Sequence, residues 1–214
     1  MNTADLIDEA ELLKLGSATL YEASKMDCFL DVAFRPAWEG AELVGRAYPV
    51  LAALGDNLAL HHGIERAADG DVLVVDAGGG AYGYWGEVMT VAAQARGVRG
   101  LVIDGGVRDT RELARLAFPA FSTRISIRGT VKQWPGVVGR SVTLRGRVVH
   151  HGDLVVADRD GVVILPSDRV DDITAASRIR ADKERDFMAR LRAGETTLDL
   201  YDFRKLEEPD SSGM

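Results

Sequence analysis

Cysteine and long apolar runs are the scarcest features of this sequence. Cys28 is the only cysteine, which excludes a disulfide within the chain and a thiolate metal cluster. No apolar run approaches the about 18 residues that a membrane-spanning helix needs, and residues 1–10 are acidic and lack the apolar core of a secretion signal. We therefore expect a cytoplasmic protein that does not bind a membrane.

Positive charge is also in short supply. Lys and Arg total 26 against 33 Asp and Glu, so the net charge is −7. A general electrostatic grip on nucleic acid needs a basic surface, and we expect no nucleic-acid partner. This balance still permits a local basic pocket for a small acid. The length of 214 residues and the hydrophobic content of 46% predict one globular domain over residues 1–206. Residues 207–214 are polar and predict a disordered tail.

Glycine, by contrast, is plentiful and clustered, which predicts tight loops. The apolar run within Asp71–Asp76 is typical of a strand buried on both faces, and a glycine-rich loop is expected directly after it. A helix is predicted over residues 86–96, followed by a second buried strand over Gly100–Asp104. This strand–helix–strand order favours a parallel crossover and an α/β fold. The helix should present one apolar face made of Val88, Val91, Ala92 and Ala95.

Local patterns place the remaining elements. Gly16 separates two short predicted helices, and Pro49 is expected to interrupt a strand. Asp56 or Asn57 is the predicted cap of a helix that ends at Arg66. The predicted ranges are helices at 4–14, 17–26, 57–66, 110–117 and 167–191, a loop at 28–40, a strand at 42–51 and antiparallel hairpins over 118–166.

Two interpretations compete for the glycine cluster. Gly78–Gly83 fits the G-x-G-x-x-G dinucleotide fingerprint, with Asp104 at the end of the next strand. However, the match falls within a glycine triplet, and Tyr82, Tyr84 and Trp85 crowd the segment before the helix begins. We favour a site in which backbone N–H groups at the helix N-terminus bind a carboxylate.

Arg108 and Asp109 follow the second buried strand and a Gly-Gly turn. Asp109 could simply cap the next helix, with Glu112 as its capping-box partner, and Glu87 could simply favour a helix dipole. Yet Arg108 stands at a strand end, where α/β proteins bind ligands, and a guanidinium suits a carboxylate. Glu87 and Asp109 would supply two carboxylates to one spot, which suits a hard divalent cation with several waters. The sequence therefore predicts an anion-binding and metal-binding site.

These residues also carry a resemblance to a known family. Glu87, twenty residues, then Arg108-Asp109-x-x-Glu112 resembles the Asp-x20-Arg-Asp-x2-4-Glu/Asp motif of the 4-hydroxy-4-methyl-2-oxoglutarate/4-carboxy-4-hydroxy-2-oxoadipate aldolases. The wider family includes the RraA-type regulators of ribonuclease E. The resemblance spans roughly residues 15–205, and its further motifs are 55–61, 102–109, 118–121 and 152–163.

The resemblance implies a fold and an assembly. The fold would be a layered αββα, swivelling-domain-like α/β structure with a central mixed sheet, antiparallel hairpins and a long C-terminal helix. That helix, about residues 167–193, would be an arm between subunits. The assembly would be a homotrimer or a homohexamer with its sites at subunit interfaces.

The resemblance also implies roles for individual residues. Asp109 would ligate Mg²⁺ or Mn²⁺, with Glu87 and Glu112 acting through water. A small 2-oxo acid would be held by Arg108 and by backbone amides. The implied catalytic residues are Glu87, Arg108, Asp109 and Glu184, and the implied substrate-binding residues are Gly86, Glu87, Val88, Met89, Arg108, Asn57 and Glu22, some of them from a neighbouring chain. Glu87 departs from the family, which has aspartate there.

The resulting functional prediction is a divalent-metal-dependent retro-aldol cleavage of 4-hydroxy-2-oxo acids to pyruvate, in the degradation of aromatic compounds, with oxaloacetate decarboxylation as a second activity. No lysine lies in an apolar strand, which disfavours a Schiff base, and neither His61-His62 nor His150-His151 has zinc spacing. The alternatives are a lyase or decarboxylase for another 2-oxo acid and a non-catalytic regulator of ribonuclease E. Glu112 and Glu184 favour the enzyme.

Overall fold

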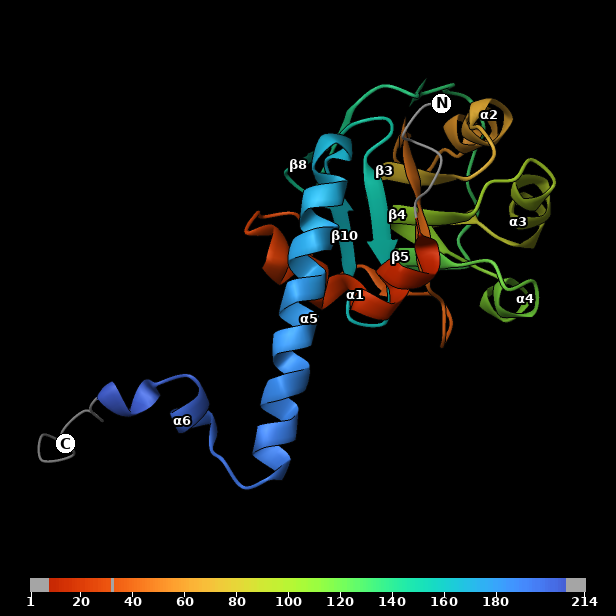
Figure 1. The fold of residues 1–214 in the computed structure, drawn as a ribbon. Helices are drawn as coiled ribbons and strands as arrows, with labels where there is room; N and C mark the ends of the chain where they lie inside the picture. The colour runs from red at the N-terminus through yellow and green to blue at the C-terminus, as the bar shows by residue number, and fades with distance from the viewer. Residues whose placement is uncertain (1–7, 32, 207–214) are drawn as a thin grey trace, which may run out of the picture.

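The computed structural model describes residues 8–31 and 33–206 and shows a curled mixed sheet whose helices pack against one face, while the other face is covered in part by a β-hairpin (Figure 1). The main sheet has the order β1-β5-β4-β3-β2-β9-β10, with β6 paired to β2. The strands are β1 (Arg35–Pro36), β2 (Leu43–Leu51), β3 (Asp71–Trp85), β4 (Gly100–Val107), β5 (Ala120–Ile125), β6 (Val137–Val138), β9 (Leu154–Ala157) and β10 (Val162–Leu165). A separate hairpin pairs β7 (Val142–Leu144) with β8 (Arg147–Val149).

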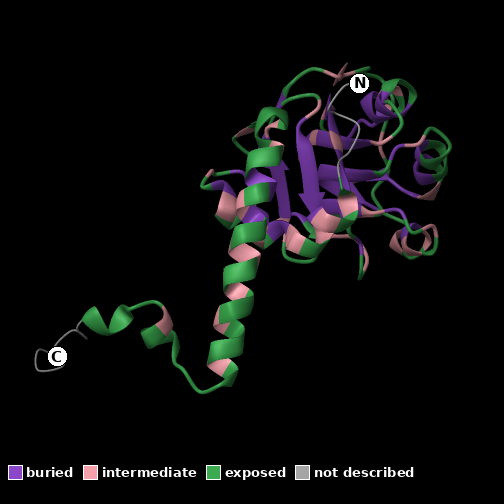
Figure 2. Ribbon diagram, viewed as in Figure 1, coloured by how far each residue is buried: buried purple, intermediate pink, exposed green. Residues whose placement is uncertain are grey.

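The centre of the sheet is parallel, and its side chains alternate between two cores. Leu73 and Val75 of β3 pack toward α2 (Leu58–Arg66), α3 (Glu87–Gln94) and α4 (Thr110–Arg115). Val72 and Val74 pack on the other face with residues of the β7–β8 hairpin. All four side chains are buried, as expected for strands covered on both faces, and Figure 2 shows the strands at the centre of the sheet coloured as buried. The predicted α/β fold with a mixed sheet is confirmed.

The glycine-rich segment is strand and not the loop that the sequence predicted. β3 continues to Trp85 and pairs with β4 through register shifts, with Gly80 opposite Gly105 and Gly83 opposite Gly106. A Cβ on Gly106 would overlap the Tyr82 carbonyl oxygen. The glycines therefore allow two bulged strands to approach closely. The dinucleotide fingerprint is also wrong here, because it requires a strand-to-helix turn.

The first helix confirms the predicted break. α1 (Glu9–Ser24) is interrupted at Gly16, whose φ of 80° and ψ of 156° are not helical. Asp158 stabilises the restart by accepting hydrogen bonds from the Ser17 backbone and hydroxyl, both at 2.7 Å. Asp8 caps the start by accepting from the Glu11 amide. The predicted helix residues 4–7 lie outside the described part of the chain.

The predicted apolar face of α3 is wrong. Val88 and Val91 are 81% and 51% exposed, whereas Met89, Thr90 and Ala93 are buried. The Trp85 indole N–H donates to the Thr90 hydroxyl at 2.8 Å, which fixes the rotation of the helix and turns Val88 outward. The 3.6-residue period was present, but both candidate faces of this Ala-rich and Val-rich helix are apolar.

Three further expectations need correction. Residues 118–166 are not all hairpins, because β5 pairs parallel to β4 and β6 pairs with β2, while β7–β8 and β9–β10 are antiparallel as predicted. Pro49 does not interrupt β2, since it falls between the stretches of β2 that pair with β9 and with β6. The expected loop over 28–40 contains the short strand β1.

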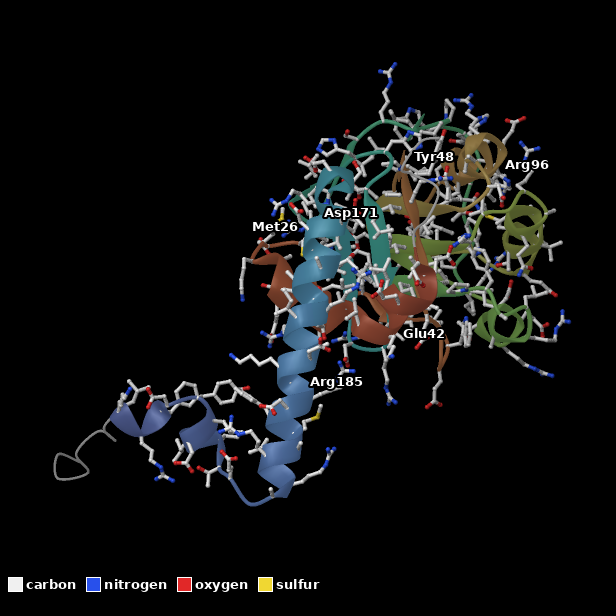
Figure 3. The ribbon with its side chains drawn as sticks, viewed as in Figure 1. Met26, Glu42, Tyr48, Arg96, Asp171 and Arg185 are labelled. Carbon is white, nitrogen blue, oxygen red and sulfur yellow. The ribbon has the colours of Figure 1, made fainter. Side chains whose placement is uncertain are left out.

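The C-terminal helix is an arm that leaves the body of the protein. A 3-10 turn (Ser167–Arg169) leads into α5 (Val170–Arg192), whose buried residues are Ile173, Thr174 and Ser177. No residue within 178–206 is buried, and Figure 3 shows Arg185 on the part that stands clear of the sheet. α6 (Thr197–Leu200) and a second 3-10 turn (Phe203–Lys205) follow. The tail predicted over 207–214 lies outside the described residues. Within the described chain, no helix is long and apolar enough to span a membrane.

Candidate functional site

The candidate site is built around Asp109, at the junction of β4 and α4. Asp109 occupies the N-cap position of α4 in the left-handed conformation, with φ of 55° and ψ of 37°. The sequence suggested that the Asp109 side chain caps α4, but it makes no hydrogen bond to that helix. Oδ2 instead accepts a hydrogen bond from the Glu87 amide at 3.0 Å and so caps α3. A non-glycine residue in this conformation is uncommon, and here the conformation turns the carboxylate onto the neighbouring helix.

Gly86 makes this approach sterically possible. It precedes α3 in an extended conformation. A Cβ at this position would overlap Asp109 Oδ2 and lie 3.1 Å from Arg108 Cγ. Only glycine therefore lets Asp109 reach the first amides of the helix without displacing neighbouring groups.

Buried hydrogen bonds hold the start of α3 from behind. The Gly86 carbonyl accepts from the Thr90 amide and hydroxyl, both at 3.0 Å. The same hydroxyl accepts from the Trp85 indole, and the Trp85 carbonyl accepts from the Arg108 amide at 2.8 Å. The end of β3 and the loop that follows β4 are thus tied together, which positions the first turn of α3 against Arg108.

Arg108 supplies the positive charge next to this helix start. Its Nε lies 3.7 Å from Asp109 Oδ2, and its side chain is about half exposed. The first amides of a helix have no acceptor within the helix. Of those in α3, Asp109 accepts a hydrogen bond only from the amide of Glu87. The guanidinium and the amides of Val88 and Met89 therefore offer donors to a carboxylate from solvent. The Val88 side chain points outward and would contribute only its backbone.

Asn57 lies behind the same helix start. It is 5% exposed, and its Nδ2 donates to the Tyr84 carbonyl at 2.9 Å and to the Met89 sulfur at 3.4 Å. The sequence offered Asn57 as one of two candidate caps of α2, but its side chain makes no capping hydrogen bond. Asp56 takes that role by accepting from the Leu58 amide at 2.8 Å. Asn57 Oδ1 is buried and accepts no hydrogen bond from the described residues.

Glu87 and Glu112 both lie near Asp109, and both are engaged by one arginine that the sequence did not single out. Arg115 Nε contacts Glu112 Oε2 at 2.6 Å, and its Nη2 contacts Glu87 Oε1 at 3.2 Å. The hydrogen bond and charge of Glu112, and then those of Glu87, raise the pKa of Arg115 above its ordinary value. Glu112 does not form the predicted capping box. The i, i+3 spacing of Glu112 and Arg115 on one helix could have predicted this ion pair from the sequence.

Glu22 and Glu184 form a different cluster. Both pair with Arg180, Glu184 at 2.8 Å and Glu22 in close contact across the α1–α5 interface. Arg180 Nε is buried and has no acceptor among the described residues. α1 and α5 pack at the β9–β10 end of the sheet, whereas α3 and α4 pack beside β3 and β4 (Figure 1). A single chain therefore does not bring Glu22 and Glu184 to Asp109.

The donor set fits a hydrated divalent ion and not a protein cage. Within the described residues, no group of three or more His, Cys, Asp or Glu side chains is arranged to hold a metal. Glu87 and Glu112 are paired with Arg115, while Asp109 Oδ1 accepts no hydrogen bond from a described residue. Mg²⁺ commonly keeps several waters and uses one or two carboxylates. The residues present fit that mode through Asp109.

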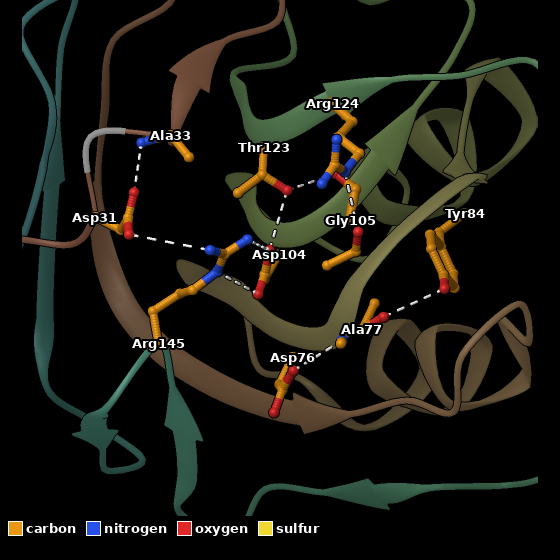
Figure 4. A network of polar contacts seen from close by, with 12 residues as sticks. Asp31, Ala33, Asp76, Ala77, Tyr84, Asp104, Gly105, Thr123, Arg124 and Arg145 are labelled. Carbon is orange, nitrogen blue, oxygen red and sulfur yellow. Dashed lines mark hydrogen bonds and ion pairs between the residues drawn. The ribbon is translucent and has the colours of Figure 1, made fainter.

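Asp104, the acid of the dinucleotide pattern, has a structural partner. Arg145 binds it through two hydrogen bonds of 2.7 and 2.9 Å, and the Thr123 hydroxyl donates at 3.0 Å (Figure 4). Asp104 is buried, and Asp31 lies 4.0 Å from the same arginine. This network anchors the β7–β8 turn to the middle of β4. The Asp104 carboxylate is therefore paired with Arg145 and unavailable for a ribose.

Comparison with known proteins gives one family match. Residues 3–164 match the RraA-like model, described as Aldolase/RraA. A protein of Halalkalibacterium halodurans with the provisional name 4-hydroxy-4-methyl-2-oxoglutarate aldolase is 33% identical over 157 residues, which is 72% of this chain and 75% of that one. A Methanocaldococcus jannaschii protein without an assigned activity is 31% identical over 81% of this chain and 83% of its own.

Solved structures show the same fold. A protein from Pseudomonas syringae pv. tomato aligns with a TM-score of 0.78 at 26% identity and covers 93% of both chains. RraAS2 of Streptomyces coelicolor, described as an unusual member of the RNase ES inhibitor RraA family, aligns with a TM-score of 0.73 at 27% identity over 86% of this chain and 96% of that one.

Proposed function

The chain belongs to the RraA-like (Aldolase/RraA) family, and from this premise we propose that it is a lyase that cleaves 4-hydroxy-2-oxo acids such as 4-hydroxy-4-methyl-2-oxoglutarate and 4-carboxy-4-hydroxy-2-oxoadipate to pyruvate. The observation that carries the proposal is the placement of Asp109. It stands beside Arg108 and a helix N-terminus, with one carboxylate oxygen committed to the Glu87 amide and the other accepting nothing from the described residues.

A divalent cation, Mg²⁺ or Mn²⁺, is the proposed cofactor. Asp109 would hold it, and Glu87 and Glu112 could act only through water while Arg115 engages them. When bound, the ion supplies positive charge that stabilises the negative charge developing on the 2-oxo oxygen.

Arg108 and the amides of Val88 and Met89 bind and orient the substrate. Charge-assisted bonds to a carboxylate are the strong ones, and a fixed carboxylate holds the adjacent 2-oxo group beside Asp109. The buried bonds among Trp85, Thr90 and Gly86 keep these donors in place before substrate arrives. Preorganised donors are the main means by which a protein stabilises developing charge.

The reaction also needs a proton acceptor. As the C3–C4 bond breaks, its electron pair moves toward C2 and its oxygen, the 4-hydroxyl loses a proton, and C4 becomes a carbonyl. C3 then takes a proton to give pyruvate. Glu87, in the first turn of α3 and partly exposed, would position a water that accepts the hydroxyl proton.

Glu184 and Glu22 would join the site from another copy of the chain. Within one chain they pair with Arg180 on the α1–α5 side, and α5 extends beyond the body as an arm (Figure 3). A trimer or hexamer with sites between subunits would bring the arm to a neighbour's Asp109, where Glu184 could act as a second proton carrier.

The same arrangement supports decarboxylation of oxaloacetate, because loss of CO₂ leaves negative charge on the same 2-oxo oxygen. A non-catalytic binding role is the second candidate. It is favoured by the engagement of both glutamates by Arg115, which leaves fewer free acids than the sequence suggested.

Pyruvate release separates the two candidates. Purified chain stripped of metal and then supplied with Mn²⁺ should release pyruvate from 4-hydroxy-4-methyl-2-oxoglutarate, and Arg108→Lys should raise KM because a single ammonium replaces the fork. Absence of metal-stimulated release from this substrate and from oxaloacetate would refute the proposed activity and leave a lyase for another 2-oxo acid or the binding role.

A further inference from the structure

Arg115 closes a triangle of charges beside Asp109. It lies on the last turn of α4, three residues after Glu112, and reaches across to Glu87 on α3. One guanidinium thus joins the two helices that start at the site. Its planar fork is suited to two oxygens at once.

The triangle determines which acid is free. Glu87 Oε1 and Glu112 Oε2 are directed to Arg115, at 3.2 and 2.6 Å, whereas Asp109 is directed to the amide of Glu87. The side chain of glutamate is one methylene longer than that of aspartate, and this length lets residue 87 reach Arg115 from the first turn of α3. The departure at residue 87 and the arginine at residue 115 therefore act together.

Without Arg115, the carboxylates of Glu87, Asp109 and Glu112 would be left with Arg108, 3.7 Å from Asp109, and with Arg111, which comes no closer than 4.0 Å to Glu112. Two negative charges would then gain freedom to turn toward Asp109, and the local charge would become more negative by one. A more acidic site binds a divalent cation more tightly and an anionic substrate more weakly.

From this geometry we infer that Arg115 is a positioning residue that holds Glu87 and Glu112 away from Asp109, so that the site offers one carboxylate to a cation and keeps room and charge for a dianionic 2-oxo acid. The inference deepens the proposed function and rests on it. In this proposal Arg115 acts through the two glutamates that it contacts and not by binding either ligand itself.

The test is direct binding, with Mn²⁺ and the unreactive dianion oxalate as probes. Calorimetric titrations at low ionic strength would compare wild type, R115Q and R111Q. Arg111 is the matched control, because it lies on the same helix, is 96% exposed and comes no closer than 4.0 Å to Glu112. The charge change is the same in both variants.

We expect R115Q to bind Mn²⁺ about tenfold more tightly, because a freed carboxylate near the ion attracts the cation. At saturating Mn²⁺ it should bind oxalate about tenfold more weakly, because the same carboxylate repels the dianion. R111Q should stay within about twofold of wild type. In an E87Q background, the effect of R115Q should fall by at least half, because Glu87 then has no charge to release.

The other possible results would refute the role of Arg115, the role of Glu87 or the proposed function. Equal effects of R115Q and R111Q would show that only net charge matters and overturn the role of Arg115. An undiminished effect in the E87Q background would overturn the role of Glu87 in it. Wild-type protein that binds neither Mn²⁺ nor oxalate would overturn the proposed function itself, and the inference with it. Arg115 is exposed, so its replacement is not expected to unfold the chain.

Discussion

Replacing Asp109 by asparagine and by alanine should separate its support of α3 from its chemistry. Asparagine keeps an oxygen that can accept from the Glu87 amide, and it tolerates the left-handed conformation. Asp109→Asn should therefore change the free energy of unfolding by less than about 0.5 kcal/mol. Alanine removes the cap, which costs about 1 kcal/mol, and strains the left-handed backbone by about another 1 kcal/mol. The Asp109→Ala substitution should thus cost about 2 kcal/mol in total.

The chemistry should respond differently. Both substitutions remove the carboxylate, so both should lower metal-dependent pyruvate release by at least about 100-fold. Urea unfolding measures the first effect and a coupled pyruvate assay the second. If Asp109→Asn unfolds as easily as Asp109→Ala, the capping argument is wrong. If Asp109→Asn keeps turnover near that of the wild type, the charge of Asp109 is not used in the reaction.

Three further substitutions and one matched control test the architecture. Arg145→Gln should lower the free energy of unfolding, measured in urea, by about 2–4 kcal/mol, because it leaves the buried Asp104 carboxylate without its ion-pair partner while Arg145 itself is partly exposed. An unchanged free energy of unfolding would refute the structural role of this pair. Gly86→Ala should cost about 1–3 kcal/mol and reduce turnover through overlap with Asp109, whereas Gly129→Ala, with open space around it, should be neutral in both assays. Burial alone would raise the pKa of Asp56, but its hydrogen bonds from three backbone amides lower it below its ordinary value. Stabilisation by Asp56 is thus present above the unfolded pKa of about 3.9 and lost as the pH falls through the folded value, so Asp56→Ala should cost about 2–4 kcal/mol at about pH 7 and progressively less below about pH 4.

Much of the fold followed from local patterns in the sequence. The apolar residues between Asp71 and Asp76 marked a buried strand, Gly16 marked a break between two helices, and the charged run after Ser167 marked a long helix. These signals are strong because they depend on residues close in the chain. The predicted break at Pro49 was wrong, because whether a strand tolerates a proline depends on where its neighbouring strands begin and end. That is a property of the whole sheet and not of the local sequence.

The glycine cluster shows a second limit. A run of glycines is compatible with a loop or with bulged strands in close contact, and only the glycines of β4 facing it decide between them. Local sequence therefore favoured a loop where tertiary contact makes a strand.

The sequence predicted in part which residues of the candidate site lie together. The structure brings together Gly86, Glu87, Arg108, Asp109 and Asn57, and leaves Glu22 and Glu184 apart within one chain. The capping of α3 by Asp109 was not predicted, because an acid before a helix ordinarily caps its own helix. Arg115 was missed for a similar reason, since its second partner, Glu87, is distant in sequence.

The most direct test of the proposed function is metal-dependent pyruvate release from 4-hydroxy-4-methyl-2-oxoglutarate by metal-stripped wild-type chain, with Asp109→Asn as the control for non-enzymatic reaction. The proposal predicts release that depends on added Mg²⁺ or Mn²⁺ and is lost in Asp109→Asn. Equal release by the two proteins, or none from the wild type at any metal concentration, would contradict it.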